Sequence, residues 1–299
     1  MKTALIEPPI VPLERSLTMA DFAELVKARL TFLVLITTAV GFYLGWEGPL
    51  NFLALAHTVL GTAGAAAGAA ALNQWWEHRL DAIMLRTRTR PIPAGRMSPR
   101  EGLITGLILS LAGVIYLTLA VNGLSALLAA LTIALYLFAY TPLKRFSTTN
   151  TLVGAIPGAI PPVIGWVAAR HTLDAGAWSL FAILFLWQMP HFFALAWMYR
   201  ADYARAGFRM MSNDDETGLR SASQSVLFCI LLLMIAGVPL YVGLTTIVYL
   251  PIGLTLSGWF VAMAMLFHKQ RTPQNARRLF LSSIIYLPLL LAALVLTKK

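Results

Sequence analysis

Nine long apolar runs are the feature that most restricts the fold of this chain. Crossing a bilayer takes roughly 20 mostly apolar residues. Within hydrocarbon a segment must satisfy its own backbone groups, so a run that is apolar all round, such as Val226–Leu244, predicts a helix rather than an alternating barrel strand. The predicted spans are Leu30–Trp46, Phe52–Asn73, Gly102–Val121, Leu124–Tyr140, Thr151–Ala169, Trp178–Met198, Ser225–Leu244, Ile247–Phe267 and Leu279–Leu296.

Positive charge is distributed unevenly between the connections. Of the 23 lysines and arginines, all but Arg170, Lys298 and Lys299 fall in the first 30 residues or in the connections after the even-numbered spans. The positive-inside rule then places the N-terminus and those loops in the cytoplasm and the C-terminus outside. The sequence predicts a bacterial inner-membrane protein with a cytoplasmic segment 1–27, one membrane domain 28–299, and cytoplasmic loops 74–101, 141–150, 199–224 and 268–278.

The formal net charge of +10 is assigned to this orientation and to contact with anionic membrane lipid. No nucleic-acid partner is expected, because the chain offers no soluble basic domain to bind one. The single cysteine, Cys229, lies in an apolar run and excludes both an internal disulfide and a CxxC metal site.

Three oxygen-bearing side chains recur at helical spacing where the second span reaches the cytoplasmic side. Asn73, Glu77 and Asp81 are four residues apart, which puts them on one helix face. Carboxylate and amide oxygens suit Mg²⁺, which is usually held by one or two carboxylates together with substrate phosphates. The row therefore predicts half of a metal–diphosphate site.

Basic residues follow this row directly. Arg86, Arg88 and Arg90 could grip phosphate oxygens in bidentate fashion, or could simply meet anionic lipid headgroups. Lys144 and Arg145 add phosphate contacts or anchor their span. Asp202, between Arg200 and Arg205, is either a further metal ligand or a paired surface acid.

One histidine lies inside a predicted span. Ionisable residues within a membrane are candidates for function, and His191 could ligate haem iron, act as a base or hydrogen-bond a neighbouring helix. From the residues alone, the hydrogen bond to a neighbouring helix is favoured.

Several segments resemble the protoheme IX farnesyltransferases (haem O synthases), a branch of the UbiA-type intramembrane prenyltransferases. The resemblance extends from about Lys27 to the last span. Its carriers are Asn73–Asp81, Met84–Pro91, Tyr140–Arg145, Asn150, Gly158–Pro162, Trp187–Trp197 and Asp202–Tyr203. The segment Trp-Gln-Met-Pro-His-Phe together with Asp-Tyr selects the haem branch. The resemblance implies an all-α polytopic fold with about nine helices around a central apolar chamber.

The resemblance also implies a reaction: transfer of the farnesyl group of farnesyl diphosphate to the vinyl group of haem B, with release of diphosphate. Haem B is a substrate here, Mg²⁺ the cofactor with Mn²⁺ as alternative, and haem A synthase or terminal oxidase assembly a candidate partner. Site roles follow by position. The metal ligands are Asn73, Glu77, Asp81 and Asp202; the diphosphate contacts are Arg86, Arg90, Lys144 and Arg145; the haem contact is His191.

The chain departs from the superfamily pattern at two positions. Glu77 and Arg79 stand where many members have aspartate, which lengthens one ligand arm and removes another possible ligand. Two other functions compete with haem farnesylation: prenylation of an aromatic quinone precursor, and transport. Transporters often show repeats and acids near mid-bilayer, whereas these acids gather at one end.

Overall fold

The computed structural model describes residues 18–299, and its regular elements are helices apart from one isolated bridge between Thr245 and Lys298. Lys2 and Arg15, counted above as cytoplasmic cations, lie outside the described residues. The helices are α1 (Met19–Leu25), α2 (Ala28–Gly45), α3 (Phe52–Asp81), α4 (Pro99–Ala120), α5 (Gly123–Ala134), the π-helix η1 (Leu135–Tyr140), α6 (Thr141–Phe146), α7 (Asn150–Ala159), α8 (Pro161–Arg170), α9 (Ala175–Met198), α10 (Arg200–Arg205), α11 (Leu219–Met234), α12 (Val238–Tyr241), α13 (Tyr249–Lys269) and α14 (Pro273–Leu296).

Nine helical segments within residues 18–299 are long and apolar enough to cross a membrane, which confirms the prediction of nine spans. The largest difference is at α3, which continues through Asp81 instead of ending near Asn73. The apolar run ends near Asn73, but the helix continues because Gln74, Glu77 and Leu80 have good helix propensity. As a result, the oxygen-bearing row lies inside the helix.

Prolines mark two interruptions in the spans. The span from Asn150 to Arg170 divides at Ile160 into α7 and α8, immediately before Pro161. In the span before it, the wide turn of η1 precedes Pro142, whose missing N–H interrupts the α-helical ladder. By contrast, Pro190 lies inside α9, which continues past it to Met198. A single π-turn within a helix is often found at a functional site.

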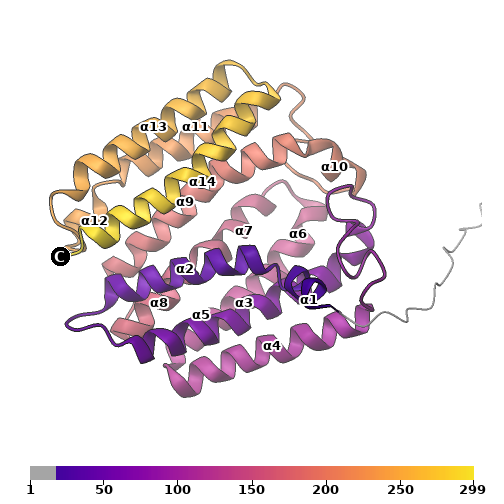
Figure 1. Cartoon of the computed structure of the whole chain (residues 1–299). Coiled ribbons are helices and arrows are strands. Elements are labelled where there is room, and N and C mark those ends of the chain that lie inside the picture. Colours follow the sequence, from indigo (N-terminus) through magenta and orange to yellow (C-terminus); the bar gives the residue numbers. More distant parts are fainter. Residues whose placement is uncertain (1–17) are drawn as a thin grey trace, which may run out of the picture.

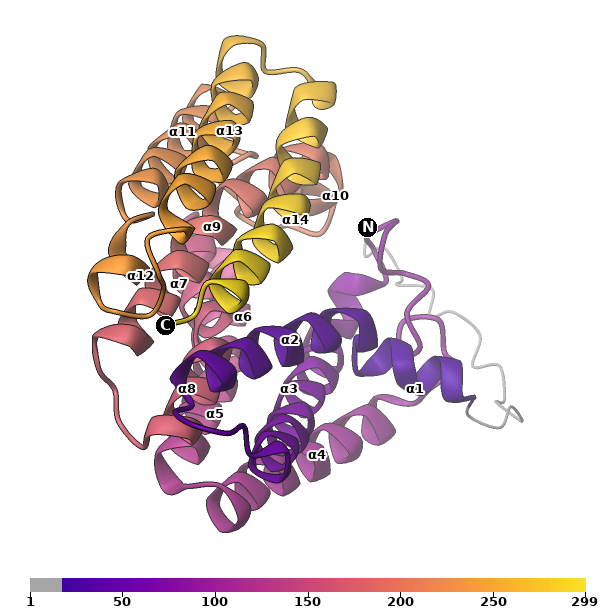
Figure 2. The same ribbon diagram turned by 60° about the vertical axis from the view of Figure 1, so that its left-hand side comes forward.

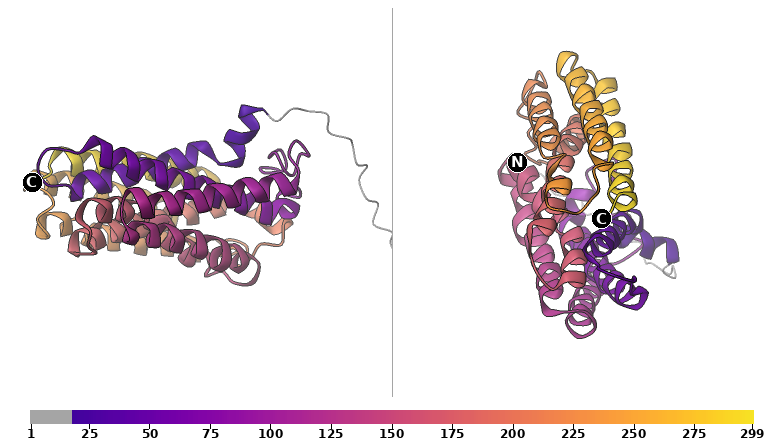
Figure 3. Two further views of the ribbon diagram at one scale, coloured as in Figure 1. Left: turned by 90° about the horizontal axis from the view of Figure 1, so that it is seen from below. Right: turned by 90° about the vertical axis from the view of Figure 1, so that its left-hand side faces the viewer.

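The helices pack in a circuit. α2 contacts α3, and the contacts then run through α4, α5 with η1, α7, α9, α11, α13 and α14, which returns to α2; α8 packs against α2, α5 and α9 (Figures 1 and 2). Seen from below, the axes of the long helices run roughly parallel to one another (Figure 3, left). α1 and α10 lie at one end of this bundle, and the C-terminus and α12 lie at the other.

Large apolar side chains cover much of the outside of the bundle. On α4 and α5 they include Ile108 (60% exposed), Leu119 (82%) and Leu127 (63%). A water-soluble monomer rarely exposes contiguous apolar surface on this scale. Together with the nine spans, this surface makes the chain an integral membrane protein.

Close packing against α4 fixes the position of α3. A Cβ atom on Gly113 of α4 would lie 2.3 Å from the backbone nitrogen of Ala65, and one on Gly68 of α3 would lie 2.4 Å from the backbone nitrogen of Ser110. Only glycine allows two backbones to approach this closely. The small-residue stretch of the second span therefore provides tight packing, and this packing holds the end of α3 that carries the oxygen row.

Candidate functional site

The predicted oxygen row is buried at the end of α3. Asn73, Glu77 and Asp81 are exposed by only 1%, 5% and 3%. Their four-residue spacing turns them by about 40° per step, and the Asn73 Nδ2 donates to Glu77 Oε2 at 2.9 Å. Buried carboxylates need partners, because an unpaired buried charge is costly.

Three cations from three different segments meet this row. Lys144 of α6 donates to both carboxylate oxygens of Glu77 at 2.9 Å. Arg90, in the loop after α3, donates to Asp81 Oδ2 at 2.7 Å. Lys27, between α1 and α2, donates to Asn73 Oδ1 at 2.8 Å. Two carboxylates thus face the side chains of two lysines and an arginine, so the cluster becomes net positive when all three are protonated, which an anionic ligand would favour.

Lys27 is a site residue that sequence reasoning missed. It was counted only as a cation that sets the topology, yet its backbone is left-handed, with φ of 48° and ψ of 52°. Such a conformation is unusual for a non-glycine residue and often lies at functional sites. Burial, aided by the nearby Arg90 and Lys144, lowers the pKa of Lys27 to about 7. An incoming anion would favour its charged form.

The π-helix η1 and the start of α6 complete the wall around Asn73. The Tyr136 hydroxyl donates to Asn73 Oδ1 at 3.1 Å, and Asn73 Nδ2 donates to Thr141 Oγ1 at 3.2 Å. The Lys144 ammonium lies 4.5 Å from the centre of the Tyr140 ring. No local sequence signal marked Tyr136, and Thr141 stood out only as part of the segment Tyr140–Arg145, because both residues reach the row from a different span.

Asp202 belongs to a neighbouring cluster and not to the row itself. Its two carboxylate oxygens accept the backbone N–H groups of Leu85 (3.0 Å) and Arg86 (3.1 Å), and Arg205 adds a bond of 2.7 Å. Burial alone raises the pKa of Asp202, but these two amides and Arg205 outweigh it and lower the pKa below its usual value. Asp202 therefore anchors the basic loop that follows α3.

The other predicted phosphate contacts lie further out. Arg86 is exposed, and its guanidinium carbon lies 5.3 Å from the centre of the Tyr199 ring. Arg145 is also exposed, whereas its neighbour Lys144 turns inward to Glu77. The structure thus brings Arg90 and Lys144 to the row and leaves Arg86 and Arg145 at its edge.

His191 contacts a neighbouring helix, as the sequence favoured. Its Nδ1 lies 2.7 Å from Ser283 Oγ of α14. The rings of Trp187 and Phe280 lie against the imidazole, with centres 5.5 and 4.7 Å away. The residue precedes the end of α9 by seven positions, as Asn73 precedes the end of α3 by eight. At 1.5 Å per residue, each is roughly 10–12 Å from its helix end.

The three side chains of the oxygen row could hold a divalent cation such as Mg²⁺ only together with oxygens of a bound substrate. Among residues 18–299, no three His, Cys, Asp or Glu side chains lie together as a ready metal site. The oxygens of Asn73, Glu77 and Asp81 nevertheless share one face and have the right chemistry for Mg²⁺. Each of these oxygens is now hydrogen-bonded to Lys27, Lys144 or Arg90. A metal would have to displace these three side chains from the oxygens, and a bound diphosphate could then accept their hydrogen bonds.

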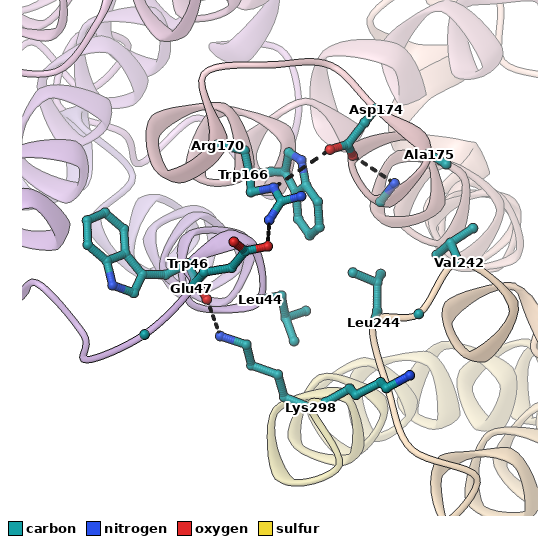
Figure 4. Close-up of a pocket in the computed structure, with 14 residues that line it drawn as sticks. Leu44, Trp46, Glu47, Trp166, Arg170, Asp174, Ala175, Val242, Leu244 and Lys298 are labelled. Carbon is teal, nitrogen blue, oxygen red and sulfur yellow. Dashed lines mark hydrogen bonds and ion pairs between the residues drawn. The ribbon is translucent and has the colours of Figure 1, made fainter.

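A cavity of about 570 Å³ lies at the opposite end of the bundle (Figure 4). It is lined by Arg170, Lys298 and Lys299, the three cations that the sequence assigned to the outer side. Their neighbours satisfy two of them: Arg170 pairs with Glu47 and lies 3.8 Å from Asp174, and Lys298 donates to backbone carbonyls. This cavity is remote from the oxygen row, and the charge of Arg170 is already met by acidic neighbours.

The chain matches known proteins along most of its length. The model of the UbiA prenyltransferase family matches residues 34–287. A protoheme IX farnesyltransferase from Solibacter usitatus is 44% identical over 94% of this chain and 99% of that protein.

Among solved structures, a digeranylgeranylglyceryl phosphate synthase aligns with a TM-score of 0.79 at 15% identity, over 93% of this chain and 98% of the other. A UbiA homologue from Archaeoglobus fulgidus, bound to GPP and Mg²⁺, aligns with a TM-score of 0.62 at 13% identity, over 92% and 99%. These two establish the fold. The family match and the relative at 44% identity establish more than the fold: the chain belongs to the UbiA prenyltransferase family.

Proposed function

We propose that this chain transfers the farnesyl group of farnesyl diphosphate to the vinyl group of haem B, forming haem O and diphosphate. The observation that carries the proposal is the likeness to a protoheme IX farnesyltransferase over 99% of that relative's length. The site is compatible with it, because two buried carboxylates and an amide meet three cations at one end of an apolar bundle.

The diphosphate is proposed to bind at the oxygen row by exchange of partners. Lys27, Lys144 and Arg90 would turn from the row to phosphate oxygens, and the freed oxygens of Asn73, Glu77 and Asp81 would hold Mg²⁺. A UbiA homologue was solved with GPP and Mg²⁺ bound, which supports this for the family fold. When bound, the metal supplies Lewis acidity and neutralises the charge of the leaving group.

The reaction is proposed to begin with cleavage of the C1–O bond of farnesyl diphosphate, whose electron pair leaves with the diphosphate. Lys144 and Arg90 stabilise that departing charge. The terminal vinyl carbon of haem B then bonds to C1. Water captures the cation left on the other vinyl carbon and releases a proton, which gives a hydroxyethylfarnesyl side chain. An apolar chamber beside the row, as the resemblance implies, would keep water from the allylic carbon before that step.

Haem B is proposed to lie beside His191. This side chain and Asn73 are at similar depths from the same end of the bundle, so a porphyrin at His191 and a diphosphate at Asn73 would lie at the same level of the membrane. Flat contacts are available from Trp187 and Phe280. The neutral imidazole is the commonest metal ligand in proteins, and we assign His191 as the contact to the iron.

The distribution of charge supports a location in the bacterial inner membrane with the site on the cytoplasmic side. The end with the oxygen row carries almost all of the described cations, while Arg170, Lys298 and Lys299 gather at the other. Under the positive-inside rule the C-terminus then faces outward. Haem A synthase or the assembly of a terminal oxidase would receive the product.

The deciding experiment is to incubate the purified chain with farnesyl diphosphate, haem B and Mg²⁺, and to measure haem O by mass spectrometry. Haem O is expected in the complete reaction. It should vanish with EDTA and return with added Mg²⁺, and parallel reactions with Mn²⁺ rank the two metals. Prenylation of an aromatic acid such as 4-hydroxybenzoate, without haem O, would instead assign the chain to the quinone branch.

Asp202→Asn is expected to raise the KM for farnesyl diphosphate about tenfold with little change in kcat. An asparagine accepts only one of the two N–H bonds from Leu85 and Arg86, and an unsatisfied buried group costs about 1–3 kcal/mol. The basic loop is therefore held less firmly. Interactions that are equally strong with the bound substrate and with the transition state are lost, which raises KM and leaves kcat unchanged. Steady-state kinetics test this, with exposed Asp214→Asn as control. A collapse of kcat that excess Mg²⁺ relieves would make Asp202 a metal ligand instead.

A further inference from the structure

Two oxygen atoms beside His191 determine where its proton lies. Ser283 Oγ lies 2.5 Å from the backbone oxygen of Phe280. A carbonyl oxygen cannot donate, so two oxygens this close require the serine hydroxyl proton between them. Since a hydroxyl has one proton, Ser283 can only accept from its other neighbour, the Nδ1 of His191 at 2.7 Å. The neutral imidazole must therefore carry its proton on Nδ1.

The consequence falls on the other ring nitrogen. With the proton on Nδ1, Nε2 of His191 keeps its lone pair, and in residues 18–299 no hydrogen bond occupies that nitrogen. The backbone of Ser283 is itself held, because Trp187 donates to its carbonyl oxygen at 2.8 Å. Ser283 is fully buried. Both the tautomer and the direction of the ring are thus set from α14.

We propose that Ser283 is a positioning residue that presents the Nε2 lone pair of His191 to the iron of haem B. This inference rests on the proposed function and adds to it. A metal-binding histidine usually donates its second N–H to an oxygen, which fixes the tautomer, and loss of that oxygen costs about ten- to a hundredfold in metal affinity. The relay from Phe280 through Ser283 to His191 has this form.

The competing explanation is that the hydrogen bond between His191 and Ser283 only holds α9 against α14. Metal-free protoporphyrin IX distinguishes the two explanations, because it has the shape of haem B but no iron to ligate. A positioning role predicts a loss of affinity for haem B alone. A purely structural role predicts that both porphyrins are affected alike, or neither.

The experiment titrates wild type, Ser283→Ala and Ser282→Ala in detergent with haem B and with protoporphyrin IX. Ser282 is a matched control, since within residues 18–299 its hydroxyl bonds only to the backbone oxygen of Arg278 in its own helix. For Ser283→Ala we expect about ten- to a hundredfold weaker binding of haem B, a changed haem absorption spectrum, and unchanged binding of protoporphyrin IX. Ser282→Ala should match wild type in all three measurements.

The inference is overturned if Ser283→Ala binds haem B with wild-type affinity and spectrum, or if its affinity for both porphyrins falls equally. Failure of the proposed function is a separate result, in which the wild type itself forms no haem O. If the wild type forms haem O and the Ser283→Ala variant has an unaltered haem spectrum, only the proposed role of Ser283 is overturned and the proposed function stands.

Discussion

Replacing Asp81 with asparagine is expected to lower kcat for farnesyl transfer about a hundred- to a thousandfold. The carboxylate is 3% exposed, and in the free protein its charge is met by Arg90 at 2.7 Å. In the proposed complex that charge holds Mg²⁺ against the diphosphate. Asparagine keeps the size and one acceptor of the side chain but removes the charge that the metal requires, so the loss falls on the chemical step.

Folding of the Asp81→Asn variant should be largely preserved. The Arg90 side chain is 18% exposed and so retains some access to water. The backbone carbonyl of Asp81 still accepts the hydroxyl of Thr87 at 2.9 Å. We therefore expect a cost of about 1–3 kcal/mol, or a drop of a few degrees in Tm.

The measurement pairs haem O formation with thermal unfolding in detergent. Asp214→Asn removes an exposed carboxylate near the same end of the bundle and should change neither quantity. A fully active Asp81→Asn variant would remove Asp81 from the metal site. An inactive variant with a much lower Tm would show only that the side chain supports the fold, and Asp81→Glu, which keeps the charge, would then be the informative variant.

The parts of the site that could be predicted from sequence are those set by local spacing. Asn73, Glu77 and Asp81 share a face because four residues nearly complete a helical turn. The spans followed from hydropathy, because a membrane offers few ways to satisfy a backbone. Hydropathy missed most at the end of α3, where polar residues with good helix propensity continue the helix into the site; the seventh and ninth spans also begin earlier than predicted, at Leu219 and Pro273.

The parts that could not be predicted depend on contacts between distant segments. Lys27 and Tyr136 reach Asn73 from positions 46 and 63 residues away, and neither lies in a motif. The left-handed backbone at Lys27 has no sequence signal, because lysine does not favour it. Likewise, the sequence placed Asp202 near the phosphate site but could not reveal that it binds two backbone amides, since that depends on the path of the loop.

Neutralising Glu77 and Lys144 together is expected to separate the stability of the site from its chemistry. Lys144→Met alone leaves the Glu77 carboxylate, whose side chain is 6% exposed, without its cation. Breaking a buried pair in this way costs about 3–5 kcal/mol. Glu77→Gln alone leaves the Lys144 ammonium, 12% exposed, in the same situation. Both single variants should unfold more easily and lose activity.

The double variant Lys144→Met/Glu77→Gln should regain most of the lost stability, because a neutral pair has no charge to desolvate. Because each single variant loses about 3–5 kcal/mol while the double variant loses little, the unfolding free energies of the four proteins should give a coupling energy of at least about 3 kcal/mol. As a control, the same cycle on the part-exposed pair Arg96 and Glu24, whose side chains are 31% and 43% exposed, should give a coupling of about 0.2–1 kcal/mol.

Activity should not recover with stability. The proposed reaction needs the Glu77 carboxylate at the metal and the Lys144 ammonium at the departing diphosphate, and neither requirement is met by a neutral pair. A stable but inactive double variant would indicate that this ion pair is retained for chemistry at some expense to folding. A stable double variant that still forms haem O at the wild-type rate would reduce Glu77 and Lys144 to a structural pair, and the metal would then have to be held by Asn73 and Asp81 alone.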